Sequence, residues 1–246
     1  MDAMHQYGVM LYNGEGVQAN VEESARYLKT AAANGQVESS YDFAMMLFKG
    51  IGVPQDQQEA SHYFKSAALQ GYVPSMYSYA LICDQGLGVP VNKIEAMKYF
   101  KMAAENGDID SIKYLNSLIE SGQINSENNP IDREELTGYL KIVAESGDMD
   151  FMFKYASKCR NGDGVPQNFE EAIKYYKLAA DKGHLESLHD YAMMLDNGEG
   201  IEMNKTEAVQ LLKNAADKGN VNSMFDYAEK LYLGDGVDKN KKEAAR

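Results

Sequence analysis

The stretch GDGVPQNFEEAIKYYKLAADKG, residues 162–183, carries three marks that recur along this chain of 246 residues. It opens with Gly-x-Gly, continues through an Asn with a Glu three residues later, and ends with Ala-Ala-x-x-Gly. The opening glycine recurs every 36 residues, with a single interval of 40, at Gly14, Gly50, Gly86, Gly122, Gly162, Gly198 and Gly234. A period of this length predicts a solenoid of stacked supersecondary units.

The second mark predicts where one helix of each unit begins. Its members are Asn20, Asp56, Asn92, Asp132, Asn168, Asn204 and Asn240, each followed three residues later by a glutamate. The Asn or Asp oxygen can accept a backbone N–H of the first turn, while the glutamate is expected to reach back to the N–H of the cap residue. Seven helices are therefore predicted to begin at these positions. Asn204-Lys205-Thr206 is also a glycosylation sequon, but it overlaps a helix cap and stands alone.

Two helices are predicted in each unit. The first, helix A, shows an i, i+3, i+4, i+7 apolar stripe at Leu188, Tyr191, Ala192 and Leu195, the spacing that places side chains on one helix face. The second, helix B, ends at a glycine such as Gly183, which can adopt the left-handed cap conformation. Because one hairpin cannot bury its apolar face alone, stacked copies are required.

The fold predicted from these marks is all-α, a right-handed α-solenoid of about seven 36-residue helix-turn-helix repeats. The repeats are predicted to form one domain, with bounds 1–36, 37–72, 73–108, 109–148, 149–184, 185–220 and 221–246. The fourth copy is degenerate, since Leu115-Asn116 replaces Tyr-Ala and four extra residues fall within 123–131. The last copy lacks most of its helix B, so we expect the sequence to be part of a longer protein.

The combination of Tyr191-Ala192, Gly162-Asp163-Gly164-Val165, Glu171-Ala172 and the Ala-Ala-x-x-Gly of residues 179–183 resembles the Sel-1-like repeat of the tetratricopeptide-repeat superfamily. The resemblance covers the whole chain, although the tryptophan common in helix B is replaced by tyrosine. It implies that helix A lines the concave side of the solenoid.

The charge balance restricts the partners. With 37 acidic and 24 basic residues the formal net charge is −13, which opposes binding to nucleic acid or to anionic membranes. The longest apolar run, residues 43–48, is much shorter than the roughly 20 residues of a membrane span. No secretory signal is visible in residues 1–11, and two cysteines cannot form a disulfide framework. The predicted location is the cytoplasm.

No catalytic, metal or cofactor site is expected, and the chain is predicted not to be an enzyme. The Gly-x-Gly elements follow helices rather than strands, so they predict turns rather than phosphate-binding loops. Cys83 and Cys159 occupy a register position otherwise filled by aliphatic residues, which favours buried thiols. His5 and His189 share a position with aromatic residues, which favours rings on a binding face.

The exposed face of helix A is the predicted binding surface for a protein or peptide. The residues assigned to it are Tyr12, Tyr41, Met45, Phe48, Tyr77, Leu81, Asp84, Phe153 and His189. Aromatic and Met side chains are enriched at protein interfaces, and an acidic rim at Asp84 and Glu15 would favour a partner with basic residues beside apolar ones. The alternative for these apolar residues is packing against the neighbouring repeat.

An adaptor that holds a protein segment on helix A is the predicted function. Two alternatives are a regulatory or targeting module of a larger protein with an enzymatic domain, and a purely structural spacer. No oligomeric state is predicted.

Overall fold

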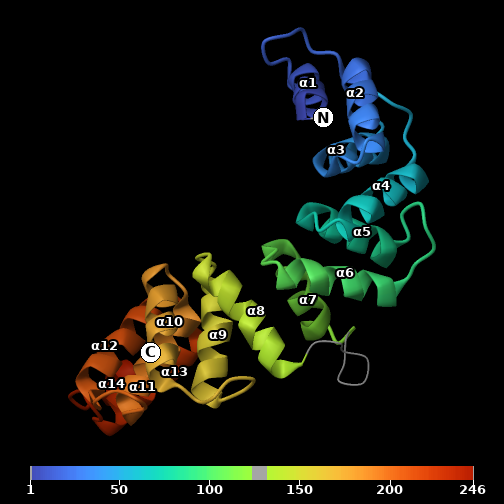
Figure 1. Cartoon of the computed structure of the whole chain (residues 1–246). Helices are drawn as coiled ribbons and strands as arrows, with labels where there is room; N and C mark the ends of the chain where they lie inside the picture. The colour runs from blue at the N-terminus through green and yellow to red at the C-terminus, as the bar shows by residue number, and fades with distance from the viewer. Residues whose placement is uncertain (1, 124–131, 246) are drawn as a thin grey trace. The chain divides into compact units, whose positions relative to one another are not determined.

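The computed structural model describes residues 2–123 and 132–245, which form fourteen helices. The chain divides into two compact units, Met1–Pro130 and Ile131–Arg246. Figure 1 shows the first unit in blue to green and the second in yellow to red. The predicted all-α class and its helical-hairpin repeats are confirmed, while one continuous solenoid domain and its handedness stay predictions.

In the first unit, each helix packs against its neighbours in the chain. Its helices are α1 (Asp2–Asn13), α2 (Val21–Ala33), α3 (Val37–Lys49), α4 (Gln57–Leu69), α5 (Val73–Gln85), α6 (Lys93–Glu105) and α7 (Ile109–Glu120). The odd-numbered members are the predicted A helices, and the even-numbered members are the B helices.

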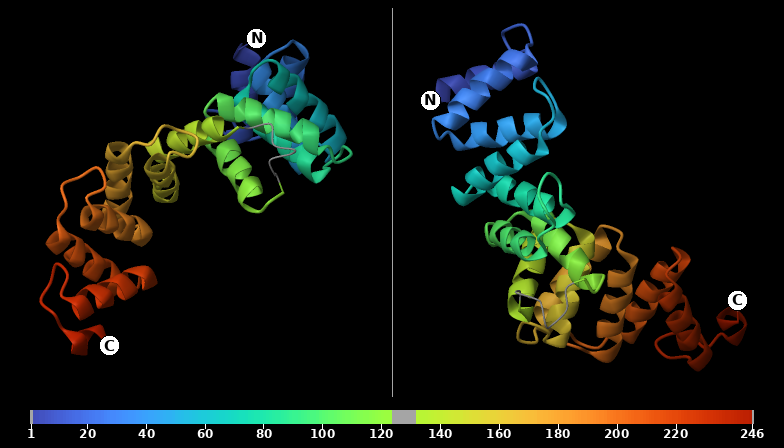
Figure 2. Two further views of the ribbon diagram at one scale, coloured as in Figure 1. Left: turned by 90° about the horizontal axis from the view of Figure 1, so that it is seen from below. Right: turned by 90° about the vertical axis from the view of Figure 1, so that its right-hand side faces the viewer.

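The second unit repeats this arrangement, as the two views of Figure 2 show. It contains α8 (Arg133–Glu145), α9 (Met149–Asn161), α10 (Phe169–Asp181), α11 (Leu185–Asn197), α12 (Lys205–Asp217), α13 (Val221–Leu233) and α14 (Lys241–Ala244). The predicted four-residue insertion falls mainly in residues 124–131, which lie outside the described part of the chain.

The predicted starts of the B helices are confirmed at all seven positions, because each Asn or Asp side chain accepts the backbone N–H of the glutamate three residues later. The predicted role of the glutamate is wrong, as the first repeat shows. There the N–H of Asn20 donates to the carbonyl of Leu11 in helix A, and the Asn20 amide donates to the carboxylate of Glu23. The cap N–H therefore joins helix B to helix A instead of closing a local capping box.

The second glycine of Gly-x-Gly is required by close packing as well as by its backbone conformation. Gly52 has a φ of +69°, and a Cβ at this position would lie 2.3 Å from the carbonyl oxygen of Val21. The glycine that ends helix B also has a positive φ, but a Cβ on Gly71 or Gly183 would meet nothing within 4 Å. The turn between the helices thus rests on the first turn of helix B in the preceding repeat.

Alanines and aromatic rings form the core of each unit. Paired alanines such as Ala67 and Ala68 are fully buried where helices approach closely. One ring from each helix of a pair meets edge to face, as with Tyr79 and Tyr99, whose centroids lie 4.8 Å apart. Cys83 and Cys159 are buried, as predicted.

Candidate functional site

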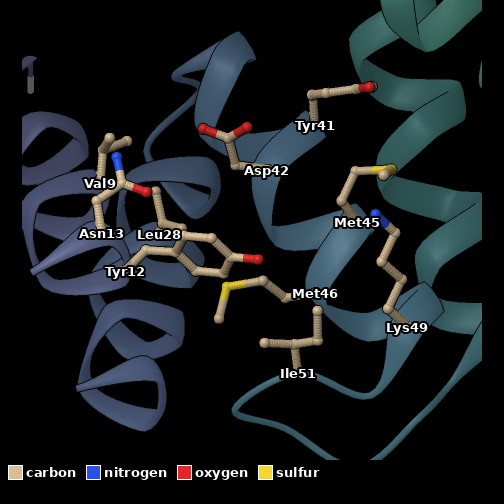
Figure 3. Close-up of a pocket in the computed structure, with 10 residues that line it drawn as sticks. All are labelled: Val9, Tyr12, Asn13, Leu28, Tyr41, Asp42, Met45, Met46, Lys49 and Ile51. Atoms are coloured by element: carbon tan, nitrogen blue, oxygen red, sulfur yellow. The ribbon is translucent and has the colours of Figure 1, made fainter. Parts of the chain in front are cut away.

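A pocket of about 310 Å³ opens between α1 and α3 in the first unit. Three of the residues predicted to bind a partner line it: Tyr12, Tyr41 and Met45. Figure 3 shows Tyr12 facing Met46 and Ile51 across the pocket. The other lining residues are Val9, Asn13, Leu28, Asp42 and Lys49. The pocket therefore combines an apolar surface with one acidic and one basic side chain.

The pocket is open to solvent at the rings that face it. Tyr12 is 42% exposed, and Tyr41 is half-buried because its ring packs on two others. Its centroid lies 5.7 Å from that of Phe64 and 5.4 Å from that of Tyr72. Tyr41 thus packs against Phe64 of helix B in its own repeat and against Tyr72, which precedes α5, and it also lines the pocket.

Asp42 joins the two helices that form the pocket. Its Oδ2 lies 2.9 Å from Nε2 of His5 in α1, and the side chain of Asp42 remains 36% exposed. Because an ionised carboxylate only accepts hydrogen bonds, the imidazole Nε2–H is the donor. His5 therefore ties α1 to α3, and a binding role for its ring stays a prediction.

The remaining apolar residues of the predicted surface in the first unit lie outside this pocket. Phe48 and Tyr77 are half-buried, and their ring centroids lie 6.5 Å from Phe64 and 6.0 Å from Phe100, respectively. Leu81 is also half-buried. Both ring contacts join helix A to helix B of the same repeat rather than to the neighbouring repeat. A binding role for these three residues stays a prediction.

Asp84 is a correction to the predicted surface, because it is buried rather than exposed. Its Oδ1 accepts a hydrogen bond from Lys93 at 2.8 Å and its Oδ2 accepts one from the hydroxyl of Tyr114 at 2.8 Å. Burial and the bond to Asp84 raise the pKa of Tyr114 to about 12. Asp84 connects α5 to α7, and both of its carboxylate oxygens already accept hydrogen bonds. Glu15 is exposed and accepts a hydrogen bond from Asn13.

Phe153 and His189, predicted for the same surface, lie in the second unit, where Phe153 contacts rings of its own repeat and His189 contacts the next repeat. The ring of Phe153 lies 5.9 Å from Tyr176 and 4.9 Å from His184. Nε2 of His189 lies 2.6 Å from Oδ2 of Asp226. A binding role for either residue stays a prediction.

The helix-A face of the second unit carries ion pairs where the first unit carries the pocket. Arg160 makes a bidentate contact with Glu199, with nitrogen–oxygen distances of 2.8 and 3.0 Å. This contact raises the pKa of Arg160, against the opposing effect of burial. Paired guanidinium and carboxylate groups already satisfy one another.

Residues Leu28, Met46, Ile51, Asp42 and Lys49 line the pocket but were absent from the predicted set. Leu28 and Met46 belong to the buried core and Ile51 to the turn, so the repeat register does not assign them to an exposed helix face. The contact of Asp42 with His5 could have been predicted from the sequence, because each histidine at the fifth position of a repeat has an aspartate 37 residues later.

Among residues 2–123 and 132–245, no group of three or more metal-ligating side chains is placed to hold a metal ion. No helix in this part of the chain is long and apolar enough to cross a membrane.

The stacked hairpins and the absence of any strand in the described residues place the chain among helical-repeat proteins. The Sel1 repeat family matches residues 2–36, 37–72, 73–108, 150–184, 185–220 and 221–246, so the chain belongs to that family. The interval between the third and fourth matches contains the degenerate repeat. No curated protein matches the chain.

Two solved structures share the fold. A protective antigen of uropathogenic Escherichia coli strains, c5321, described as displaying an SLR fold, matches with a TM-score of 0.70 and 24% identity. The alignment covers 99% of this chain and 51% of the antigen, so the chain spans about half of that protein. A Sel1 repeat protein from Oxalobacter formigenes matches with a TM-score of 0.57 and 24% identity, over 98% of this chain and 94% of that one.

Proposed function

We propose that this Sel1 repeat protein is a non-enzymatic adaptor that holds a protein or peptide segment on the A helices of its first unit. The supporting observation is the open pocket between α1 and α3, where Tyr12 remains 42% exposed beside the apolar side chains of Met45 and Met46. Exposed apolar surface of this kind is costly in water and is typical of interaction sites.

Family membership supports the same proposal, because Sel1 repeat proteins generally mediate interactions between proteins. The partner is a segment that carries basic residues beside apolar ones, since the first unit contains 15 acidic and 8 basic residues within 1–130. Tyrosine suits such a site, because its ring contributes contact area while its hydroxyl stays hydrated in the unbound protein.

The first step of the experiment is selection of peptides from a displayed library of random sequences on the whole chain. Calorimetry then compares the selected peptides on the wild type, Tyr12→Ala and Tyr232→Ala. Tyr232 is a matched control, since it occupies the same repeat position as Tyr12 in α13 and is 52% exposed.

Tyr12→Ala is expected to weaken binding by about 1 to 3 kcal/mol, roughly 10- to 100-fold in affinity, as for an aromatic anchor. Tyr232→Ala should leave affinity unchanged. Selection of no peptide, or equal affinity for all three proteins, would overturn the proposal, provided that circular dichroism shows both variants folded.

A further inference from the structure

The pocket between α1 and α3 has charged groups of opposite sign on one helix. Asp42 and Lys49 both belong to α3 and both line the pocket. They are seven residues apart, which at 1.5 Å per residue corresponds to about 10 Å along the helix axis. Met45 and Met46 lie between them on the same helix, as Figure 3 shows.

Each of these two charges has unused binding capacity. His5 occupies Oδ2 of Asp42, while Oδ1 has no hydrogen-bond donor among the residues that the structure describes. Lys49 is exposed, and within the same residues its ammonium group has no ion-pair partner. The contact with His5 also restricts the carboxylate of Asp42, so that less side-chain entropy is lost when Oδ1 accepts a ligand.

The geometry points to a bipolar ligand: a peptide segment with a Lys or Arg side chain at Asp42, an apolar side chain in the pocket, and a carboxylate at Lys49. This inference rests on the proposed function and adds the order and spacing of the partner's charges. The apolar side chain lies against Tyr12, Met45 and Met46. In an extended segment, about 10 Å separates residues three positions apart, at roughly 3.3 Å per residue.

The opposite order of charges is disfavoured by the same arrangement. A partner carboxylate beside Asp42 would place like charges together, and a partner cation beside Lys49 would do the same. Such juxtapositions suppress wrong partners more strongly than matched charges raise affinity. The pocket should therefore select the direction in which a segment lies as well as its composition.

The test uses the whole chain and a displayed library of random twelve-residue peptides. Selections are carried out in parallel on the wild type, Asp42→Asn, Lys49→Gln and the charge exchange Asp42→Lys with Lys49→Asp. Glu22→Gln and Lys98→Gln are controls, because both residues are exposed and outside the pocket. Thermal unfolding confirms that each variant is folded.

Peptides selected on the wild type and on both controls should contain a basic residue, then an apolar one, then an acidic residue or the free carboxylate. Asp42→Asn should remove the basic preference alone, and Lys49→Gln the acidic preference alone. The charge exchange should reverse the order. For one synthetic peptide chosen from those selected on the wild type, Asp42→Asn and Lys49→Gln should each lower the affinity about 3- to 10-fold. This decrease should be smaller at high salt.

Selection of no peptide on any variant would overturn the proposed function together with this inference. Apolar peptides without a charge order, bound through Tyr12, would overturn this inference and leave the proposed function standing. If peptides selected on the charge-exchange variant keep the wild-type order of basic and acidic residues, this inference would be overturned as well.

Discussion

His189 of α11 and Asp226 of α13 join consecutive A helices through a contact of 2.6 Å between Nε2 and Oδ2. His5 and Asp42 make the equivalent contact between α1 and α3 at 2.9 Å. Both pairs are separated by 37 residues, one repeat plus one position. A histidine at the fifth position thus serves as a link between repeats in both units.

The link at His189 depends on its protonation. Hydrogen bonds with Asp190 and then with Asp226 raise the pKa of His189, against the opposing effect of burial. Arg160 faces the same group, with Nη1 3.9 Å from Oδ1 of Asp190. Because the folded pKa is raised above the unfolded value of about 6.5, the added stability is complete below about pH 6.5 and is lost as pH rises through the folded pKa.

His189→Phe should therefore destabilise the protein at about pH 6, by roughly 1.5 kcal/mol for a lost charge-assisted hydrogen bond. The difference in the free energy of unfolding between the variant and the wild type should be smaller at about pH 9. Urea unfolding at both pH values measures it, and His62→Gln is the control because His62 is exposed on α4. A difference that is constant or grows with pH would contradict the assigned charge state.

Alanine substitutions at Gly164 and Gly183 distinguish the cost of backbone strain from the cost of steric contact. Both have positive φ, +78° and +98°, so alanine at either position should cost roughly 1 to 2 kcal/mol. A Cβ on Gly164 would also lie 2.2 Å from the carbonyl oxygen of Arg133, whereas one on Gly183 would meet nothing within 4 Å. Gly164→Ala should be more destabilising by about 1 to 3 kcal/mol in urea unfolding. Equal losses would show that the contact with α8 relaxes without cost.

Asp84→Ala should lower stability rather than binding. The substitution leaves the hydroxyl of Tyr114 without its acceptor, a loss of about 1 to 3 kcal/mol, and the pKa of Tyr114 should fall below about 12. Urea unfolding measures the loss of stability, and calorimetry with a selected peptide measures whether binding changes. Glu15→Ala is the control, because Glu15 is exposed. Unchanged stability with weaker peptide binding would return Asp84 to the binding surface.

Asn116→Ala should raise the thermal midpoint of the first unit. Asn116 is buried in α7 at a position where Ala80 is fully buried in α5, and burying an amide that finds no hydrogen-bond partner costs about 1 to 3 kcal/mol. Circular dichroism on heating measures the change. Ser117→Ala on the exposed face of the same helix estimates the contribution of helix propensity, about 0.5 kcal/mol. A lower midpoint would indicate that the amide stabilises the degenerate repeat.

The sequence by itself determined the helices and their order, because their signals are local. An Asn or Asp cap, a glycine with positive φ and an apolar stripe each act within a few residues. A repeat of 36 residues multiplied these signals and made the family recognisable. Burial of Cys83 and Cys159 followed from the same register, since each takes the place of an aliphatic residue.

Only the tertiary structure decided which residues of the A helices face solvent. The twelfth position holds Tyr12, which is exposed, and Asp84, which is buried, although the register treats them as equivalent. The difference depends on what surrounds each side chain: Lys93 of the same repeat and Tyr114 of the next repeat provide donors that satisfy the buried carboxylate of Asp84. Likewise, the pocket at Tyr12 depends on the spacing of α1 and α3 and on the link between His5 and Asp42. Contacts between residues 30 or more positions apart depend on how the helices pack. The repeat register treats all repeats as equivalent, so it contains no information about how the packing differs from one repeat to the next.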